Sequence, residues 1–271
     1  MPVPSLKAHP QGTRPRLTDA LASPTDGLPP KGAIDDALDA HAARIAALQA
    51  ALGAEGKRAL LVVLQGRDAC GKDGTVRRVF GGLNPAYSSV TSFKRPTTTE
   101  LHHDYLWRIH QALPARGTIG VFNRSHYEDV LAVRVHRLVP EAVWRRRYAQ
   151  LNEFERMLVE EGTEIRKFFL HVSKGEQLKR LEERLDDPAK SWKFEAADLK
   201  ERALWDEYTA AYEEMLEQCS TPWAPWYLVP ADRNKPREFL VGEVVLEALE
   251  RMDPKYPAPD PEVLKLRGKL E

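Results

Sequence analysis

The sequence predicts a three-layer α/β fold with a parallel central sheet of about five strands. Short apolar runs rich in Val, Ile and Leu alternate along the chain with longer segments of helical periodicity, which is the pattern of β-α-β units. The run at 58–66, RALLVVLQG, is continuously apolar, as expected for a strand that helices cover on both faces. A glycine-rich loop follows this strand and leads into another helical pattern. The crossovers between strands are expected to be right-handed.

Eleven segments carry this pattern. The predicted strands lie at 58–66, 88–93, 118–122, 165–172 and 226–229. The predicted helices lie at 34–54, 99–113, 141–161, 175–185, 198–217 and 237–251. Residues 1–33, rich in Pro and charge, are expected to form an extended arm, residues 34–252 a single domain, and residues 253–271 a polar tail.

The composition is that of an ordinary soluble enzyme or binding protein, with 42% hydrophobic and 30% charged residues. The 40 basic and 40 acidic side chains give a net charge of zero, which disfavours a nucleic-acid-binding protein. No apolar run is long enough to cross a bilayer, and residues 1–32 contain no apolar signal-peptide segment. Cys70 and Cys219 do not make a disulfide framework, so we expect a reduced, cytoplasmic protein without nucleic-acid or membrane partners.

The loop at 66–75, GRDACGKDGT, has the spacing G-x-x-x-x-G-K of a phosphate-binding P-loop. Its glycines allow successive backbone N–H groups to turn toward an anion, and the positive end of the next helix faces the same anion. The predicted phosphate ligands are Gly66, Gly71, Lys72, Gly74 and Thr75. A turn that merely joins strand to helix is the alternative, but the apolar strand before the loop and the helical pattern after it favour phosphate binding.

Two residues depart from the usual P-loop. Asp73 occupies the position after Lys72, where a Ser or Thr usually holds Mg²⁺, and a second carboxylate, Asp68, lies inside the loop. A carboxylate that faces phosphates is repelled unless a cation lies between them. We therefore expect Asp68 to bind Mg²⁺, with Mn²⁺ as a substitute. The alternative is that Asp68 caps the helix or pairs with Arg67.

A second acidic cluster follows the third strand. That strand ends at Asn123, where most P-loop enzymes carry an acidic residue that supports Mg²⁺. Glu128 and Asp129 lie a few residues further on and can supply the missing charge. His126 and Tyr127 are expected to be structural, because phosphoryl transfer depends on positioning and charge neutralisation more than on proton transfer.

Four motifs together resemble polyphosphate kinase family 2, and specifically its class III branch. They are GRDACGKDGT at 66–75, FKRPT at 93–97, FNRSHYEDVL at 122–131 and RLDDPAKSWKFEAADLKER at 184–202. The last is similar to the family's lid, and the resemblance covers about residues 34–252. Other classes carry Asp-Arg-Ser-x-Tyr-Asn-Arg where this chain has Asn-Arg-Ser-His-Tyr-Glu-Asp, so the negative charge has moved from the first position to the last two.

The resemblance implies a P-loop kinase-like fold of the thymidylate kinase type, with a helical lid at about 184–202. It also implies Mg²⁺ dependence and reversible phosphoryl transfer from inorganic polyphosphate to AMP and ADP, ending at ATP. Adenine nucleotides are the expected partners, guanine nucleotides are an open option, and a homo-oligomer is expected. The roles that the resemblance implies are metal binding for Asp68 and Asp129 with Glu128 assisting, neutralisation of the transferring group by Lys72 and Arg124, and lid closure by Arg184 and Lys193. The family's basic donor channel gives the arginines between 134 and 147 a role, without saying which of them line it.

Two other functions stay open. An ATP-dependent nucleoside or nucleotide kinase could use the same fold, although Asp68 and Asp73 in the loop disfavour it. A nucleotide-binding protein without turnover would be expected to lack the acidic residues Asp68, Glu128 and Asp129, which are present. The preferred base, the polyphosphate chain length and the direction of the reaction are not fixed by the sequence.

Overall fold

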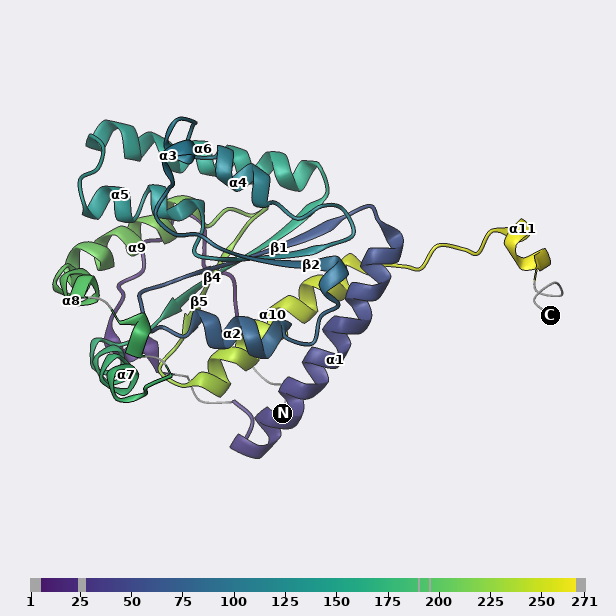
Figure 1. The fold of residues 1–271 in the computed structure, drawn as a ribbon, viewed down its shortest axis with the longest axis horizontal. Coiled ribbons are helices and arrows are strands. Elements are labelled where there is room, and N and C mark those ends of the chain that lie inside the picture. Colours follow the sequence, from purple (N-terminus) through teal and green to yellow (C-terminus); the bar gives the residue numbers. More distant parts are fainter. Residues whose placement is uncertain (1–5, 24–27, 190, 195, 267–271) are drawn as a thin grey trace.

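The computed structural model describes residues 6–23, 28–189, 191–194 and 196–266, and it has a five-stranded sheet between two layers of helices (Figure 1). The strands are β1 Ala59–Gln65, β2 Ser88–Ser92, β3 Ile119–Asn123, β4 Thr163–His171 and β5 Trp226–Pro230. All neighbouring strands are parallel, in the order β2-β3-β1-β4-β5. The predicted three-layer parallel sheet is therefore confirmed.

The strand order places a ligand crevice at the end of β1. The connection that leaves β1 runs to the β2 edge of the sheet, whereas the connection that leaves β4 runs to the β5 edge. Parallel α/β sheets bind their ligands beyond the carboxyl ends of the strands where the crossover direction changes in this way. Leu64 of β1 pairs with Asn123 of β3, so the P-loop and the second acidic cluster leave the sheet side by side.

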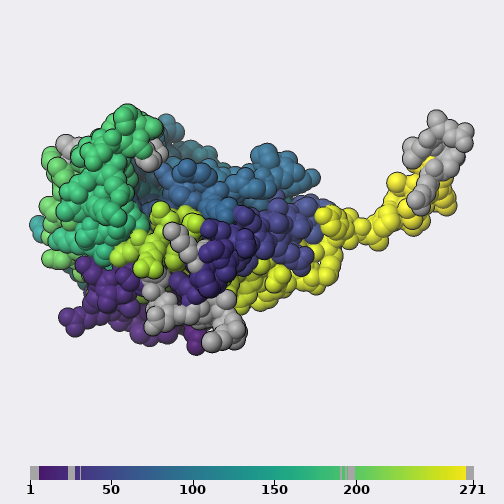
Figure 2. Space-filling model, turned by 90° about the horizontal axis from the view of Figure 1, so that it is seen from below, coloured from purple at the N-terminus to yellow at the C-terminus, as the bar shows by residue number. Residues whose placement is uncertain are grey.

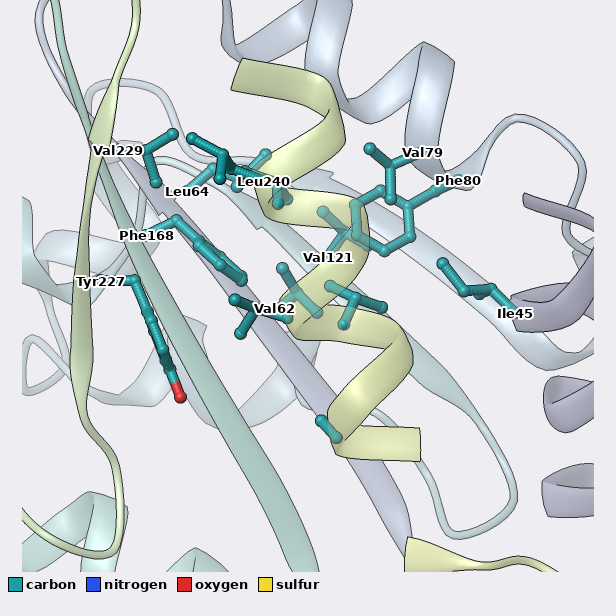
Figure 3. Close-up of a cluster of buried hydrophobic side chains, with 14 of the residues drawn as sticks. Ile45, Val62, Leu64, Val79, Phe80, Val121, Phe168, Tyr227, Val229 and Leu240 are labelled. Atoms are coloured by element: carbon teal, nitrogen blue, oxygen red, sulfur yellow. The ribbon is translucent and has the colours of Figure 1, made fainter. Parts of the chain in front are cut away.

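Two hydrophobic cores lie on the two faces of the sheet. The helices α1 Lys31–Glu55, α2 Lys72–Phe80 and α10 Asn234–Met252 cover one face, and α4 Trp107–Ala112, α6 Glu141–Glu160 and α9 Trp205–Cys219 cover the other. Because side chains alternate along a strand, Val62 and Leu64 of β1 enter the first core and Leu61 and Val63 enter the second. Figure 3 shows Val62 and Leu64 in the first core beside Leu240 of α10.

Two predicted helices are wrong in part. The segment 99–113 forms two short helices, α3 Thr98–Leu101 and α4, because Asp104 Oδ1 accepts a hydrogen bond from the Leu106 N–H and closes a tight turn between them. The segment 198–217 is likewise divided at Leu204 into α8 Ala196–Ala203 and α9. The helices η2 Pro85–Tyr87, η3 His126–Asp129 and α5 Ala132–Val135 were not predicted. Such one-turn elements carry too little periodicity to be recognised from sequence.

The amino-terminal arm follows the β5 edge of the sheet. His9 N donates to the Trp226 carbonyl, Leu17 is buried, and the arm includes the short helix η1 Asp19–Ala22. The carboxyl-terminal segment that contains α11 Pro261–Leu264 projects away from the body (Figures 1 and 2). Among the described residues, no helix is long and apolar enough to cross a membrane.

The segment predicted to be a lid lies at the end of the molecule where the strands end. It consists of the end of α7 Lys174–Asp186, of η4 Ser191–Lys193 and of α8 (Figure 1). The helix α8 of this segment is tied to the start of α7, because Arg202 Nη1 donates to the Lys174 carbonyl and to Gln177 Oε1.

Candidate active site

A cleft of about 1240 Å³ opens at the carboxyl ends of β1 and β3. Its walls come from the P-loop, the FKRPT segment, the turn after β3, and helices α7, α8 and α9. The basic residues that line it are Arg67, Lys94, Arg95, Arg108, Arg124, Arg147, Arg184 and Arg202. Its acidic residues are Asp68, Glu100, Asp104, Glu128, Asp129 and Glu201. The structure therefore brings six predicted site residues into one cavity: Gly66, Asp68, Arg124, Glu128, Asp129 and Arg184.

Each backbone carbonyl of the P-loop from Gly66 to Gly71 accepts a hydrogen bond, and those of Asp68, Ala69 and Cys70 point outward to side chains of α7 and α10. The donors are Lys72 Nζ to Gly66 and Arg67, Gln177 Nε2 to Asp68, Arg180 Nη1 to Ala69, Arg237 Nη1 to Cys70 at 3.5 Å, and Thr75 to Gly71. Gly66, Ala69 and Gly71 have positive φ angles of 151°, 60° and 100°. Such alternation is how consecutive N–H groups converge on an anion. Gly66 also has no room for a side chain, because a Cβ would lie 2.6 Å from the Leu170 carbonyl oxygen.

Lys72 and Thr75 are buried at the start of α2. Lys72 Nζ lies 2.7 Å from the Gly66 carbonyl and 3.0 Å from that of Arg67, so its charge is held inside the loop. The Thr75 hydroxyl donates to the Gly71 carbonyl and accepts from Arg237 Nε. The prediction that Thr75 contacts phosphate therefore does not extend to its side chain, which supports the loop from inside the fold.

Asp68 pairs with Arg124 rather than with Arg67. Arg124 leaves β3 with a left-handed backbone, φ 63°, and its Nη2 lies 2.5 Å from Asp68 Oδ1. Burial raises the pKa of the Asp68 carboxyl, but Arg124, Lys72 and Arg184 outweigh burial and hold it below its usual value. Asp68 is thus ionised at neutral pH, and the alternative of an ion pair with Arg67 is wrong.

Asp129 and Glu128 lie on the turn η3, immediately beyond Arg124. Asp129 Oδ1 accepts from Arg147 Nη1 at 3.3 Å, whereas its buried Oδ2 accepts no hydrogen bond from any residue that the structure describes. Arg108 Nη2 is 3.8 Å from this Oδ2. Burial raises the pKa of Asp129 to about 6 although Arg147 and Arg108 oppose the shift. The Asp129 carboxylate therefore has one oxygen, Oδ2, that is buried and has no described hydrogen-bond donor.

Glu128 and Asn123 are held by neighbours at the strand ends. Gln65 Nε2, at the end of β1, donates to Glu128 Oε1 at 2.8 Å. Asn123 Nδ2 donates to Asp73 Oδ1 at 2.8 Å. The unusual residue at the end of β3 is therefore in direct contact with the unusual residue after Lys72. The side chains of Glu128 and Asp73 are thereby fixed on either side of the strand end that carries Arg124.

A buried ionic cluster joins η3 to α6 and β4. His126 Nε2 lies 3.0 Å from Glu155 Oε1, and the Tyr127 hydroxyl donates to the same oxygen at 2.8 Å. Lys167 Nζ, on β4, is 2.5 Å from Glu155 Oε2 and also donates to Tyr127 and to the Cys219 carbonyl. All four side chains are fully buried. His126 and Tyr127 are therefore structural, as predicted.

Most of the arginines between 134 and 147 do not line the cleft. Arg134 and Arg145 both bind Glu214 and lie over the Trp144 ring, at 4.7 and 4.6 Å from its centre. Arg137 and Arg146 are exposed. Arg147 alone of the five between 134 and 147 lines the cleft, where it also lies 4.4 Å from the centre of the Tyr105 ring.

Several residues that shape the site were not predicted. Arg67 is buried over the Trp205 ring at 3.8 Å and donates to Thr209 Oγ1, which fastens the P-loop to the start of α9. Gln177 and Arg180 also hold the loop, and their spacing from Arg184 on α7 places all three on one helical face, a signal that the sequence contained. The side chain of Lys193 lies outside the described residues.

The model of the family Polyphosphate kinase 2 (PPK2) matches residues 31–257 of this chain. The chain belongs to the polyphosphate kinase 2 family. The AMP/ADP-polyphosphate phosphotransferase of Meiothermus ruber is 55% identical to it over 80% of this chain and 81% of that protein. The ADP-polyphosphate phosphotransferase of Rhodopseudomonas palustris is 46% identical over 84% of each. The crystal structure of polyphosphate kinase 2 from Arthrobacter aurescens TC1 superposes with a TM-score of 0.89 and 40% identity over 98% of each chain.

Membership in this polyphosphate kinase family decides between the functions that the sequence left open. The chain is an enzyme, a polyphosphate kinase, rather than an ATP-dependent nucleoside kinase or a binding protein without turnover. The predicted P-loop kinase-like α/β fold is confirmed by the superposition on the Arthrobacter structure.

The acidic residues of this polyphosphate kinase fit a divalent cation. Asp68 and Asp129 line the same cleft, and carboxylate oxygens are the ligands that Mg²⁺ prefers. The Oδ2 atom of Asp129 is buried without a described hydrogen-bond donor, and burial raises the pKa of this carboxyl to about 6. Among the described residues, no cluster of three or more His, Cys, Asp or Glu side chains has the form of a preformed metal site. The two carboxylates therefore suit an ion that also takes oxygens from phosphates and water.

Proposed function

We propose that this polyphosphate kinase transfers the terminal phosphoryl group of polyphosphate to both AMP and ADP, in a reversible reaction that ends at ATP. The relatives from Meiothermus ruber and Rhodopseudomonas palustris, whose names specify AMP/ADP and ADP respectively, support these acceptors. The observation that carries the proposal is the cleft itself. It joins an anion-binding loop with an internal carboxylate to a second acidic turn, within a wall of eight basic side chains.

The geometry suits phosphoryl transfer between two polyanions. Attack requires that the repulsion between the acceptor phosphate and the donor chain is first cancelled, which the N–H groups of the loop, Lys72 and Arg124 can do. The acceptor oxygen is already ionised at neutral pH and needs no general base. His126 and Tyr127, the groups that could act as one, are buried and engaged with Glu155.

Mg²⁺ is the proposed cofactor, and Mn²⁺ is the proposed substitute. Asp68 and Asp129 would hold it, with Glu128 assisting. The bound ion supplies charge neutralisation between donor and acceptor phosphates. Arg108 and Arg147, at 3.8 and 3.3 Å from the two Asp129 oxygens, keep the carboxylate oriented. The lid would exclude water, the competing acceptor, by closing Arg184 and Lys193 over the phosphates.

The donor would reach the P-loop along the cleft wall, where Arg147 is the member of the arginine run that can contact it. Guanine nucleotides are proposed only as alternative acceptors, to be tested in the same assay as adenine nucleotides. The cytoplasmic location and the homo-oligomeric state stay predictions from the sequence.

The deciding experiment supplies polyphosphate, Mg²⁺ and one nucleotide at a time, without ATP, and measures products by chromatography. ADP should give ATP, AMP should give ADP and then ATP, and chelation of the metal should abolish both reactions. A Lys72→Ala variant purified in parallel controls for contaminating nucleotide kinases. Conversion of ADP but not AMP would contradict the dual acceptor, and GDP in the same assay tests the guanine alternative. Failure of both adenine nucleotides would contradict the proposed function.

A further inference from the structure

The P-loop is contacted, on the side that does not line the cleft, by an arginine from a distant part of the sequence. Arg237, in the first turn of α10, has only 1% of its surface exposed. Its Nε donates to Thr75 Oγ1 at 2.9 Å, and this hydroxyl in turn donates to the Gly71 carbonyl. Its Nη1 lies 3.5 Å from the Cys70 carbonyl, and its Nη2 donates to Glu238 Oε1 at 2.9 Å. One planar group therefore contacts the loop, the first turn of α2 and its own helix.

The glycines of the loop make room for this arginine. A Cβ at Gly71 would lie 2.3 Å from Arg237 Nη1, and one at Gly74 would lie 3.2 Å from Arg237 Nη2. Gly71 therefore has two reasons to be glycine, its positive φ and the guanidinium packed against it. Burial lowers the pKa of Arg237, but the usual pKa of a guanidinium is so high that the group stays charged at neutral pH.

Arg180 of α7 approaches the loop independently. Its Nη1 donates to the Ala69 carbonyl at 3.0 Å, and its Nη2 donates to the carbonyls of Ala231 and Asp232 at 2.8 Å each. It thus joins the loop to the connection between β5 and α10. Among the described residues, the lining of the cleft includes neither Arg180 nor Arg237. Both charges lie behind the loop rather than in the path of the substrate.

We propose that Arg237, together with Arg180, is a positioning residue that keeps the phosphate loop in its phosphate-binding conformation. In a trans peptide the carbonyl of one residue and the N–H of the next point in opposite directions. Holding the Cys70 and Gly71 carbonyls outward therefore directs the N–H groups of Gly71 and Lys72 toward the cleft. Each guanidinium group is itself held by a glutamate of its own helix, Glu176 for Arg180 and Glu238 for Arg237, at 2.8 and 2.9 Å. This role rests on the proposed transfer from polyphosphate.

The test compares Arg237→Lys and Arg180→Met with the control Arg251→Met. Arg237→Lys keeps the charge but cannot hold Thr75, Cys70 and Glu238 at once, since an ammonium group has no planar fork. Arg251 lies on the same helix α10, but its side chain is 63% exposed and pairs with Glu164 on the surface. Four quantities are measured for each protein: kcat and KM for polyphosphate with ADP, the melting temperature, and the rise in melting temperature caused by inorganic tripolyphosphate with Mg²⁺.

The expected result for Arg237→Lys is a fall in kcat of about 10²-fold, the size of effect that a misplacement of about 1 Å produces. The tripolyphosphate-induced rise in melting temperature should shrink in both Arg237→Lys and Arg180→Met, and the control should match the wild type. Wild-type kcat and a wild-type tripolyphosphate response in both variants would overturn the proposal. If Arg237→Lys does not fold, Arg180→Met decides. Absence of ATP formation by the wild type would instead contradict the proposed function, while the tripolyphosphate response would still decide the role of the two arginines.

Discussion

Replacing Lys167 by Met should destabilise the protein strongly, because it leaves a carboxylate uncompensated in the core. Lys167 and Glu155 are both fully buried and 2.5 Å apart. Removing one partner of a buried pair costs about 3–5 kcal/mol of the free energy of unfolding. For a chain of this size each kcal/mol lowers the melting temperature by roughly 2–4 °C, so the expected drop is about 6–20 °C. The methionine fills a similar volume, so a cavity adds little to this loss.

The loss should depend on pH in a defined direction. Burial raises the pKa of Glu155, but Lys167 and His126 outweigh it, so the wild-type pKa lies below the ordinary value of 4.5. The wild-type carboxylate therefore contributes stability above pH 4.5 that is lost as the pH falls through its lowered pKa. Without Lys167, burial should raise the pKa of Glu155 above 4.5. Protonation then relieves the uncompensated charge, and the gap between variant and wild type should narrow from neutral pH toward pH 5.

Urea unfolding at pH 7.5 and pH 5, followed by tryptophan fluorescence and circular dichroism, measures this gap. The double variant Lys167→Met/Glu155→Gln should recover part of the loss at pH 7.5, since it removes both charges together. A single variant within about 1 kcal/mol of the wild type at pH 7.5, the size of an exposed ion pair, would refute the reasoning. So would a gap that stays constant between the two pH values.

The remaining predictions concern the cleft. Lys72→Ala should lose on the order of 3 kcal/mol of transition-state stabilisation with the circular dichroism spectrum retained, measured as kcat for ATP formation. Asp68→Asn and Asp129→Asn should each lose most turnover, and the double variant should be little worse than either, as expected for a shared metal; additive losses in kcat would separate their roles. Asp129→Asn should melt at the same or a higher temperature than the wild type in EDTA at pH 8. Because the pKa of Asp129 is raised to about 6, ionisation of this carboxyl lowers the stability of the wild type as the pH rises through 6. The higher melting temperature of Asp129→Asn should therefore vanish at pH 4. Arg184→Ala should lower kcat and leave the melting temperature close to the wild type; the reverse pattern would make Arg184 structural.

The sequence was sufficient for those features whose signal is local. The strand β1, buried along all seven residues, could be located because its first six residues form an uninterrupted apolar run. The P-loop could be recognised because its glycines and Lys72 must stand at fixed spacing to wrap an anion. The prediction of a single helix at 99–113 was wrong because the helical spacing of apolar residues continues through Asp104. The side chain of Asp104 competes with the helix for a backbone N–H.

The partners of the site residues could not be predicted because they come from distant parts of the chain. Asp68 pairs with Arg124, 56 positions away, rather than with the adjacent Arg67, which is drawn over Trp205. Arg237 contacts the loop across more than 160 positions and stands in an ordinary helical pattern, so nothing local distinguishes it. Gln177 and Arg180 differ from Arg237 in this respect, because the sequence shows that they share a helical face with Arg184. What the sequence does not show is that this face contacts the P-loop.

The unusual residues Asp73 after the lysine and Asn123 at the end of β3 are one structural change rather than two. In most P-loop enzymes a hydroxyl after the lysine and a carboxylate at the end of the third strand hold Mg²⁺ together. Here the carboxylate stands on the helix as Asp73 and the neutral partner on the strand as Asn123, and the two are joined by a hydrogen bond of 2.8 Å. The charge at this point is preserved, but one Asp73 oxygen is occupied by an amide. The buried oxygen without a described hydrogen-bond donor lies instead on Asp129, and we propose that the cation site is shifted along the cleft toward η3 and Asp68.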